Sequence, residues 1–231
     1  MLYVVATPIG DTQEITLRAL EVLKNADVIL CESTKESSKF LKTHGIKALR
    51  YELLNEHTTP DELRELVELC KEKNVALVSD CGTPAFCDPG NDLIRLCRRA
   101  NVEIKSVLGA SALMGLLSLS SVRLQQFLFR GFLPAENEAR AREWQSLKQE
   151  KRAFILMDTP YRLKKTVDEC VQNIGGREML LVMNLSQENE ECLEGRPAYV
   201  AQNLKFDKAE FMLLVYPSEN SSQKSITSPI L

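Results

Sequence analysis

The sequence predicts an α/β protein with two α/β domains, the first built on a parallel sheet and the second on a mixed sheet. In the first half, short apolar runs alternate with helical patterns through short connections, as in a parallel sheet with helices on its faces. Around residues 118–137 this alternation changes, and fewer helices then accompany the strands. We therefore expect an N-terminal domain over 1–117, a C-terminal domain over 118–217 and a disordered tail over 218–231.

The elements of the N-terminal domain follow from apolar runs for strands and from helical spacing for helices. Strands are expected at residues 2–6, 28–31, 49–54, 75–79 and 102–107. Helices are expected at residues 15–23 (with Asp11 or Thr12 as the cap), 35–43, 58–73, 93–100 and 113–119. The helix that starts near Thr59 has a clear start signal, because Pro60 occupies its first turn and acidic residues follow at its positive dipole end.

The C-terminal domain has fewer predicted elements. Strands are expected at residues 127–134, 154–157, 179–185 and 211–216, with helices at 136–151 and about 163–173, and an acidic stretch over 186–191. The first of these helices is charged, with Trp144 and Leu147 as its apolar side, so Trp144 is assigned to the core or to a dimer interface. Arg140 and Arg142 are assigned to a solvated face of the same helix.

Composition excludes several classes of protein. The 231 residues carry a net charge of −3, which gives no general attraction to nucleic acid or to an anionic membrane. Seven cysteines, an odd number, indicate reduced thiols in the cytoplasm, and with only two histidines we expect no metal site. No apolar run approaches the roughly 18–20 residues that a membrane span needs.

The chain is organised around residues 75–90, VALVSDCGTPAFCDPG. A buried strand ends here in a loop with two glycines and two prolines before the next helix. The carboxyl ends of parallel strands are where ligands bind, and glycine lets the backbone approach a ligand. An ordinary turn-rich connection remains an alternative, but such connections usually need only about 2–6 residues. The length of this loop favours a ligand site.

Two other strand exits carry small residues, proline or glycine, at residues 8–10 and 109–112. In a parallel sheet these exits can meet the long loop at one edge. Neither GxGxxG after the first strand nor GxxxxGK[ST] is present, which argues against NAD and ATP as ligands.

The runs LYVVATPIGD, ITLRALEVLKNADVILCEST, LNEH, VALVSDCGTPAFCDPG, GASAL and FRGFLP together resemble the tetrapyrrole methylase superfamily over residues 2–217. More narrowly, they are similar to the branch that contains the ribosomal RNA small-subunit 2′-O-methyltransferases. The resemblance implies two α/β domains that hold S-adenosylmethionine (SAM) in a cleft between them, usually in a homodimer. The cofactor-binding residues that it implies are Pro8, Gly10, Cys81, Gly82, Thr83, Phe86, Ser111, Ala112, Leu133, Asp158 and Leu185.

This sequence departs from the branch at several motifs. The turn at Leu108–Ala112 lacks two prolines, and Asp158-Thr159-Pro160-Tyr161-Arg162 stands where the branch commonly has Glu-Ser-Pro-His-Arg. The narrower motif match favours methylation of ribosomal RNA at a ribose 2′-oxygen. The acidic balance and the lack of the C-terminal helical segment of many RNA-acting members favour a small acceptor such as a tetrapyrrole. A non-catalytic SAM-binding protein is the third alternative.

Methyl transfer to a hydroxyl oxygen needs positioning of the two reactants and removal of the hydroxyl proton. Glu32, at the second strand exit, and Glu56, in Asn55-Glu56-His57, are the candidate catalytic residues. His57 beside Glu56 is considered as well, because histidine is a common general base, although a lone histidine is more often structural. Lys35 and Lys39 are the candidate contacts to RNA phosphates.

Overall fold

The computed structural model describes residues 1–218, which form two compact units, an N-terminal unit, Met1–Ala112, and a C-terminal unit that begins at Leu113. The division lies at the start of helix α5 (Ala112–Ser118), ahead of the boundary predicted after residue 117. The predicted tail, apart from Ser218, lies outside the described residues.

The N-terminal unit contains a five-stranded sheet in the order β3-β2-β4-β1-β5. Its strands are β1 (Leu2–Val5), β2 (Val28–Cys31), β3 (Tyr51–Leu53), β4 (Val75–Leu77) and β5 (Ile104–Val107). Every neighbouring pair is parallel, which confirms the predicted parallel sheet. Because all five strands point the same way, their carboxyl ends lie along one edge.

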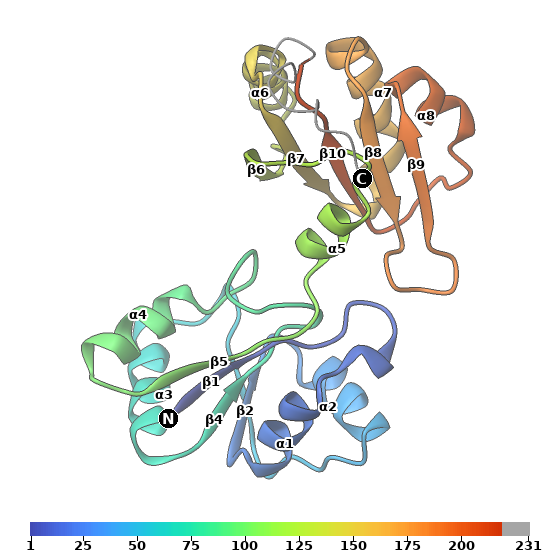
Figure 1. Cartoon of the computed structure of the whole chain (residues 1–231). Coiled ribbons are helices and arrows are strands. Elements are labelled where there is room, and N and C mark those ends of the chain that lie inside the picture. Colours follow the sequence, from blue (N-terminus) through green and yellow to red (C-terminus); the bar gives the residue numbers. More distant parts are fainter. Residues whose placement is uncertain (219–231) are drawn as a thin grey trace, which may run out of the picture. The chain divides into compact units, whose positions relative to one another are not determined.

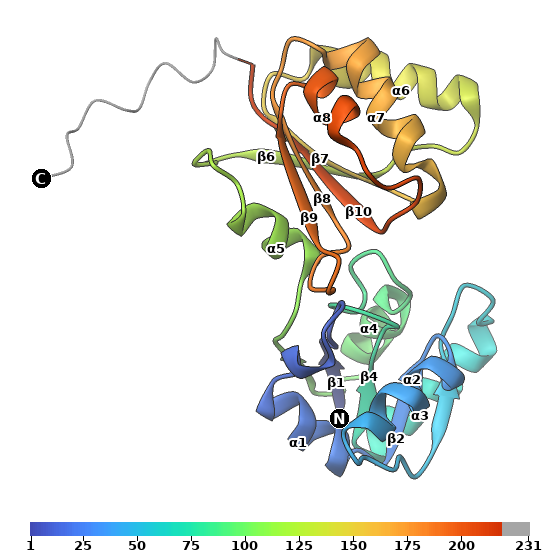
Figure 2. The ribbon, with the colours of Figure 1, turned by 90° about the vertical axis from the view of Figure 1, so that its right-hand side faces the viewer.

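Helices cover both faces of this sheet (Figures 1 and 2). They are α1 (Leu17–Asn25), α2 (Thr34–Thr43), α3 (Pro60–Glu72) and α4 (Asn91–Arg99). Side chains alternate along the strands: Leu30 packs with Leu66 of α3, whereas Ile29 packs with Leu23 of α1. Two apolar cores result, one on each face, as expected for strands buried on both sides.

The starts of two helices test the predicted caps. At α3, the Thr59 side chain accepts from the N–H of Glu62 and the Glu62 carboxylate accepts in return from the N–H of Thr59, a full capping box that confirms the predicted start. At α1, the predicted cap is wrong. Thr16 accepts from the N–H of Ala19 at 3.1 Å, whereas Asp11 caps a short 3₁₀ helix, η1 (Thr12–Glu14), that the chain makes first.

The C-terminal unit contains a second five-stranded sheet in the order β6-β7-β10-β8-β9. Its strands are β6 (Phe127–Phe132), β7 (Ala153–Asp158), β8 (Met179–Met183), β9 (Glu191–Gly195) and β10 (Phe211–Val215). β6 and β7 are parallel and all other neighbours are antiparallel, so the predicted mixed sheet is confirmed.

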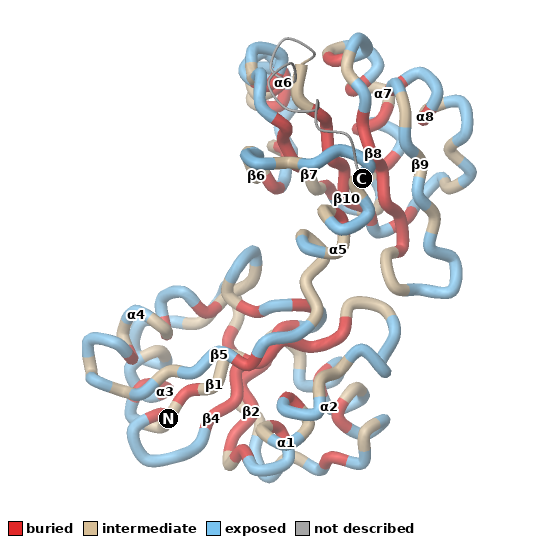
Figure 3. Tube along the Cα trace, viewed as in Figure 1, coloured by how far each residue is buried: buried red, intermediate tan, exposed pale blue. Residues whose placement is uncertain are grey.

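Helices α6 (Asn137–Gln149), α7 (Leu163–Ile174) and α8 (Pro197–Asn203) share one apolar core with this sheet. Trp144, Val167 and Val200, one from each helix, are among the residues of this core, which also contains Phe154 and Leu213 of the central strands. Figure 3 shows the buried residues concentrated along β7, β8 and β10. Among residues 1–218, no helix has the length and apolar character required to cross a membrane.

Two elements of this unit were missed in the sequence, β9 and α8. In β9 the residues alternate between half-buried and exposed, and Leu193 is its one large aliphatic residue, so no apolar run marks the strand. α8 spans seven residues and buries only Pro197 and Val200, too few for a helical period to be visible.

Candidate functional site

The exits of β1 and β4 are joined at the carboxyl edge of the N-terminal sheet. The N–H of Thr7 donates to the carbonyl of Gly82 at 2.8 Å, and the N–H of Gly82 donates back to Thr7 at 3.1 Å. Gly82 has φ +77°, a left-handed conformation in which a residue with a side chain would be strained. The carbonyl of the buried Pro8 also accepts from Gly82, at 3.4 Å. The structure thus brings the predicted residues Pro8 and Gly82 together.

The exit of β5 lies against the same edge. The Thr83 hydroxyl donates to the carbonyl of Ala110 at 2.9 Å, which links the long loop to the turn after β5. A Cβ atom on Gly109 would lie 2.9 Å from the Cβ of Ala6, so glycine is what lets the exits of β1 and β5 approach this closely. The half-buried residues that follow directly are Ser111 and Ala112.

The long loop, residues 78–90, is held in a strained conformation. Ala85 has φ +63° and Gly90 has φ +144°, and a Cβ on Gly90 would lie 3.0 Å from the Cβ of Ala85. Strained backbone of this kind gathers at functional sites, where the surrounding structure holds it in place. On the surface of the loop lie Cys81, which is exposed, and Phe86, which is 55% exposed; Gly10, in the turn after β1, is half-buried.

Glu32 follows β2 at this edge and is half-buried. Burial raises the pKa of Glu32, and the negative charges of Asp88 and Asp80 raise it further, while a hydrogen bond with the backbone of Asp80 opposes the rise. Burial is also the main cause of raised pKa values at Asp80 and Asp88. Three interacting carboxyl groups therefore lie near the exits of β2 and β4, and perturbed groups of this kind are candidates for proton transfer.

Asp80 and Asp88 were not among the predicted site residues. The signal for Asp80 is its position, because a charged residue directly after the buried run that ends in Ser79 lies at a sheet edge. Asp88 gives a weaker signal, since Asp-Pro-Gly also marks an ordinary turn before a helix. Among the described residues, no three His, Cys, Asp or Glu side chains are grouped so that they could hold a metal ion.

Glu56 lies apart from Glu32, in the loop between β3 and α3. The side chains of Glu56 and His57 are each 84% exposed, with Glu56 Oε1 3.6 Å from His57 Nε2. Glu56 lines a cavity of about 310 Å³ together with Asp88, Gly90 and the first residues of α4. None of the predicted cofactor residues lines this cavity, whose walls come from the β3–α3 loop, α3, the second half of the long loop and α4.

The three predicted residues of the C-terminal unit lie in different surroundings. Leu133 is 3% exposed and packs in the helix-covered core with Trp144. Leu185 follows β8 and packs so closely on α5 that a Cβ on Gly115 would lie 2.8 Å from it. Asp158 ends β7, and its side chain is fully buried.

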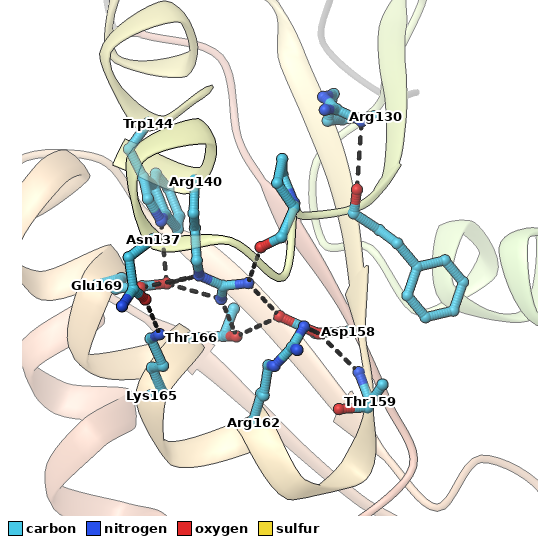
Figure 4. A network of polar contacts seen from close by, with 12 residues as sticks. Arg130, Asn137, Arg140, Trp144, Asp158, Thr159, Arg162, Lys165, Thr166 and Glu169 are labelled. Atoms are coloured by element: carbon cyan, nitrogen blue, oxygen red, sulfur yellow. Dashed lines mark hydrogen bonds and ion pairs between the residues drawn. The ribbon is translucent and has the colours of Figure 1, made fainter. Parts of the chain in front are cut away.

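The Asp158 carboxylate is held by a polar network (Figure 4). Oδ2 accepts from Arg140 at 2.7 Å and from Thr166 at 3.2 Å, and Oδ1 accepts from the N–H of Thr159 at 2.8 Å and from Arg162 at 3.2 Å. Both oxygens thus have protein partners. The solvated position predicted for Arg140 is wrong, because its side chain is 2% exposed and also pairs with Glu169.

A parallel sheet whose strand exits meet around glycines, beside a group of interacting carboxylates, is the arrangement at which α/β enzymes bind their ligands. The family model of the Tetrapyrrole (Corrin/Porphyrin) Methylases matches residues 1–199. The chain belongs to this family and is a SAM-dependent methyltransferase.

Individual relatives agree with this membership. The chain is 36% identical to the "Ribosomal RNA small subunit methyltransferase I" of Rickettsia prowazekii over 228 residues, 97% of this chain and 81% of the relative. Among solved structures, a diphthine synthase matches with a TM-score of 0.70 at 15% identity, covering 94% of this chain and 90% of that one. A uroporphyrin-III C-methyltransferase from Thermus thermophilus, complexed with S-adenosylhomocysteine, matches with a TM-score of 0.61 at 16% identity, covering 93% and 96%.

The edge of the N-terminal sheet fits SAM by its chemistry. Around Gly82 and Gly109 it presents backbone amide and carbonyl groups, which suit the adenine and amino-acid ends of that molecule. No lysine or arginine lies among residues 6–10, 80–90 or 108–112, whereas Glu32, Asp80 and Asp88 supply negative charge. A cationic sulfonium is favoured in such surroundings.

Proposed function

We propose that this protein transfers a methyl group from SAM to a ribose 2′-oxygen of small-subunit ribosomal RNA. The observation that carries the proposal is the 36% identity with a ribosomal RNA methyltransferase over 97% of this chain.

The proposed cofactor site is the joined edge of β1, β4 and β5. Pro8, Gly10, Cys81, Gly82, Thr83, Phe86, Ser111 and Ala112 are the residues of the N-terminal unit assigned to it. When bound, SAM supplies a methyl group that its sulfonium has already activated. The bridge between Thr7 and Gly82 and the bond from Thr83 to Ala110 hold the backbone groups of this edge in place before the ligand arrives. Such preorganisation reduces the entropy cost of binding and orientation.

In the C-terminal unit, Leu133 and Leu185 remain proposed cofactor residues through their backbone groups. Asp158 is assigned an indirect role, because its carboxylate oxygens already accept from Arg140, Thr166, Thr159 and Arg162. It sets the conformation of the turn that follows β7.

Glu32 is the proposed acceptor for the proton of the 2′-hydroxyl. Burial and the neighbouring Asp88 and Asp80 raise its pKa, which makes the ionised carboxylate a stronger base. Glu56 is the second candidate, but its 84% exposure leaves it without the desolvation that strengthens Glu32. Lys35 and Lys39 are exposed on α2, which begins two residues after Glu32, and are proposed to contact RNA phosphates.

The protein is proposed to act as a homodimer in the cytoplasm. None of the seven cysteines, all within residues 1–218, forms a disulfide, and Cys31, Cys70, Cys97 and Cys170 are buried, which suits a reducing compartment. Light scattering of the purified chain tests the dimer: a mass of twice 26.1 kDa is expected, and a mass of 26.1 kDa would contradict it.

The function is tested by mapping ribose methylation of small-subunit RNA in a deletion strain and in its parent. One 2′-O-methyl group is expected to disappear on deletion and to return with the wild-type gene, but not with Glu32→Gln. An unchanged map would exclude the RNA assignment and would direct attention to a small acceptor such as a tetrapyrrole.

A further inference from the structure

An aromatic side chain outside the proposed methyl-transfer site is presented to solvent beside a cation. Tyr161 lies in the 3₁₀ turn η2 (Pro160–Arg162) after β7 and is 78% exposed. The ammonium of Lys208, an exposed residue, lies 3.9 Å from the centre of the Tyr161 ring. A cation at this distance over an aromatic ring is attracted by the ring's negative face.

The strand register explains why these two residues meet. β7 and β10 are antiparallel, and Asp158 at the end of β7 lies opposite Phe211 at the start of β10. Residues just after β7 and just before β10 therefore emerge at the same edge of the C-terminal sheet. Tyr161 and Lys208 lie equally far from that pair along the chain.

The turn that carries Tyr161 is held in place by the hydrogen-bond network of Figure 4. Asp158 Oδ1 accepts from the N–H of Thr159 and from Arg162, while its Oδ2 is held by the buried Arg140. Pro160 restricts the backbone further. An exposed ring on a rigid turn loses little conformational entropy when something stacks on it, and so it favours binding.

The segment that carries this ring is basic, whereas Asp207 and Glu210 flank Lys208 in the sequence and Arg162 is paired with Asp158. The segment 159–165, TPYRLKK, contains Arg162, Lys164 and Lys165 and no acidic residue. The pairing of Lys164 with Asp168 is long, 3.4 Å, and Lys164 remains 69% exposed. Proteins hold unpaired nucleotides with an aromatic ring beside basic side chains: the bases stack on the ring, and the cations attract the backbone.

We propose that Tyr161 and Lys208 form a stacking platform for an unpaired base of the RNA substrate, with Lys164 and Lys165 attracting the adjacent phosphates. This inference rests on the proposed function in taking RNA as the acceptor. It adds an RNA-binding site on the C-terminal unit, at residues that take no part in the proposed proton or methyl transfer.

Binding of a labelled single-stranded RNA of mixed sequence, followed by fluorescence anisotropy, tests the platform directly. Tyr161→Ala is expected to weaken binding about tenfold, the scale of one lost base–aromatic stack. Tyr161→Phe keeps the ring and is expected to bind like the wild type, while Lys208→Met is expected to fall between the two. The matched control is Tyr199→Ala, which removes a 52% exposed tyrosine from α8 of the same unit and is expected to change nothing.

An oligonucleotide of abasic ribonucleotides separates stacking from charge. Wild type and Tyr161→Ala are expected to bind it equally, because it offers phosphates without bases. Equal binding of the mixed-sequence RNA by both proteins would overturn the platform, and so would a loss in Tyr161→Ala that persists with abasic RNA.

Methyl transfer to small-subunit particles gives the second measurement. Tyr161→Ala is expected to raise KM for the particle about tenfold and to leave kcat and SAM affinity unchanged. A wild type that methylates particles, with an unchanged KM in Tyr161→Ala, would overturn the platform alone. A wild type that methylates no RNA would overturn the proposed function, and the anisotropy measurement would still decide whether Tyr161 binds single-stranded RNA.

Discussion

At the residue scale, Glu32 is the group whose chemistry is most directly testable. Replacing it by glutamine keeps the shape but removes the base, so kcat for methyl transfer is expected to fall about 10²- to 10³-fold with unchanged SAM affinity. Single-turnover rates and calorimetry with SAM measure the two quantities. The matched control is Glu56→Gln, expected to change kcat less than about threefold because Glu56 is almost fully solvated. Full turnover by Glu32→Gln would remove it as the base.

The raised pKa of Glu32 has a consequence for the pH profile. Burial, Asp88 and Asp80 hold its pKa above the ordinary value, so activity is expected to fall on acidification at a higher pH than for an unperturbed glutamate. Asp88→Asn removes one negative neighbour and is therefore expected to move the acidic limb of the kcat profile to lower pH. A limb that stays in place would show that another group controls it.

Asp88 also links the site to stability. Burial and the neighbouring Asp80 raise its pKa in the folded state. A raised carboxyl pKa favours folding at low pH, and that contribution is lost as pH rises through the folded-state pKa. Asp88→Asn is therefore expected to raise the melting temperature at pH 7.5 by about 2 °C and to have no effect near pH 3, where both side chains are neutral. Scanning calorimetry at the two pH values is the measurement, and a lower melting temperature at pH 7.5 would contradict the assignment.

At the element scale, the strand exits of the N-terminal sheet depend on close backbone approach. Gly109→Ala places a Cβ 2.9 Å from the Cβ of Ala6 and is expected to push the exit of β5 away from that of β1. SAM affinity is expected to fall about tenfold, since the bond from Thr83 to Ala110 stretches with it. Gly176→Ala is the control, because nothing lies within 4 Å of the added carbon. Calorimetric titration with SAM gives both values, and equal affinities would show that the approach is not required.

Helices and strands were predicted correctly from the sequence where a single local signal, such as an apolar run or a helix cap, determines the structure. The buried strands of the parallel sheet are continuous apolar runs, and Thr59-Pro60-Asp61-Glu62 marks the start of α3 by its own hydrogen bonds. β9 and α8 were missed because their stability comes from neighbours. β9 pairs with β8, and α8 buries only Pro197 and Val200 beside a core built mostly by other elements.

In the candidate site, too, some features could be predicted from the sequence and others depend on the fold. The loop was predicted to be a ligand site because its length, after a buried strand, exceeds that of an ordinary connection. The assignment of Gly82 and Thr83 to the cofactor came from the family resemblance. The position of Asp158 at a strand end was also visible in the sequence. The ion pair between Asp158 and Arg140 was not visible, because Arg140 belongs to a helix with many charged residues. Only the fold shows that this arginine is buried.

At the scale of the whole molecule, each unit has its own sheet, with an apolar core on each face in the N-terminal unit and one shared core in the C-terminal unit. The proposed proton acceptor Glu32 and most of the proposed cofactor residues belong to the N-terminal unit. Leu133 and Leu185 of the proposed cofactor site, and the proposed base-stacking surface at Tyr161, belong to the C-terminal unit. The Arg140 network supports that surface from within the core of the C-terminal unit. A change in this network should therefore destabilise the C-terminal unit and leave the cofactor groups of the N-terminal unit in place.

Arg140→Ala tests this separation. The substitution leaves Asp158 buried without its main cation, and breaking a buried ion pair in this way costs about 3–5 kcal/mol. The melting transition of the C-terminal unit is therefore expected to fall by about 10 °C or more, and calorimetry should then resolve two transitions.

SAM at 100 times its Kd is expected to stabilise the N-terminal unit by up to about 2.7 kcal/mol in the variant as well, because Gly82, Thr83 and Gly109 are unaltered. Arg142→Ala, on the same helix but 73% exposed, is the control and should change stability by less than about 0.5 kcal/mol. A single transition that falls as a whole would show instead that the two units unfold together.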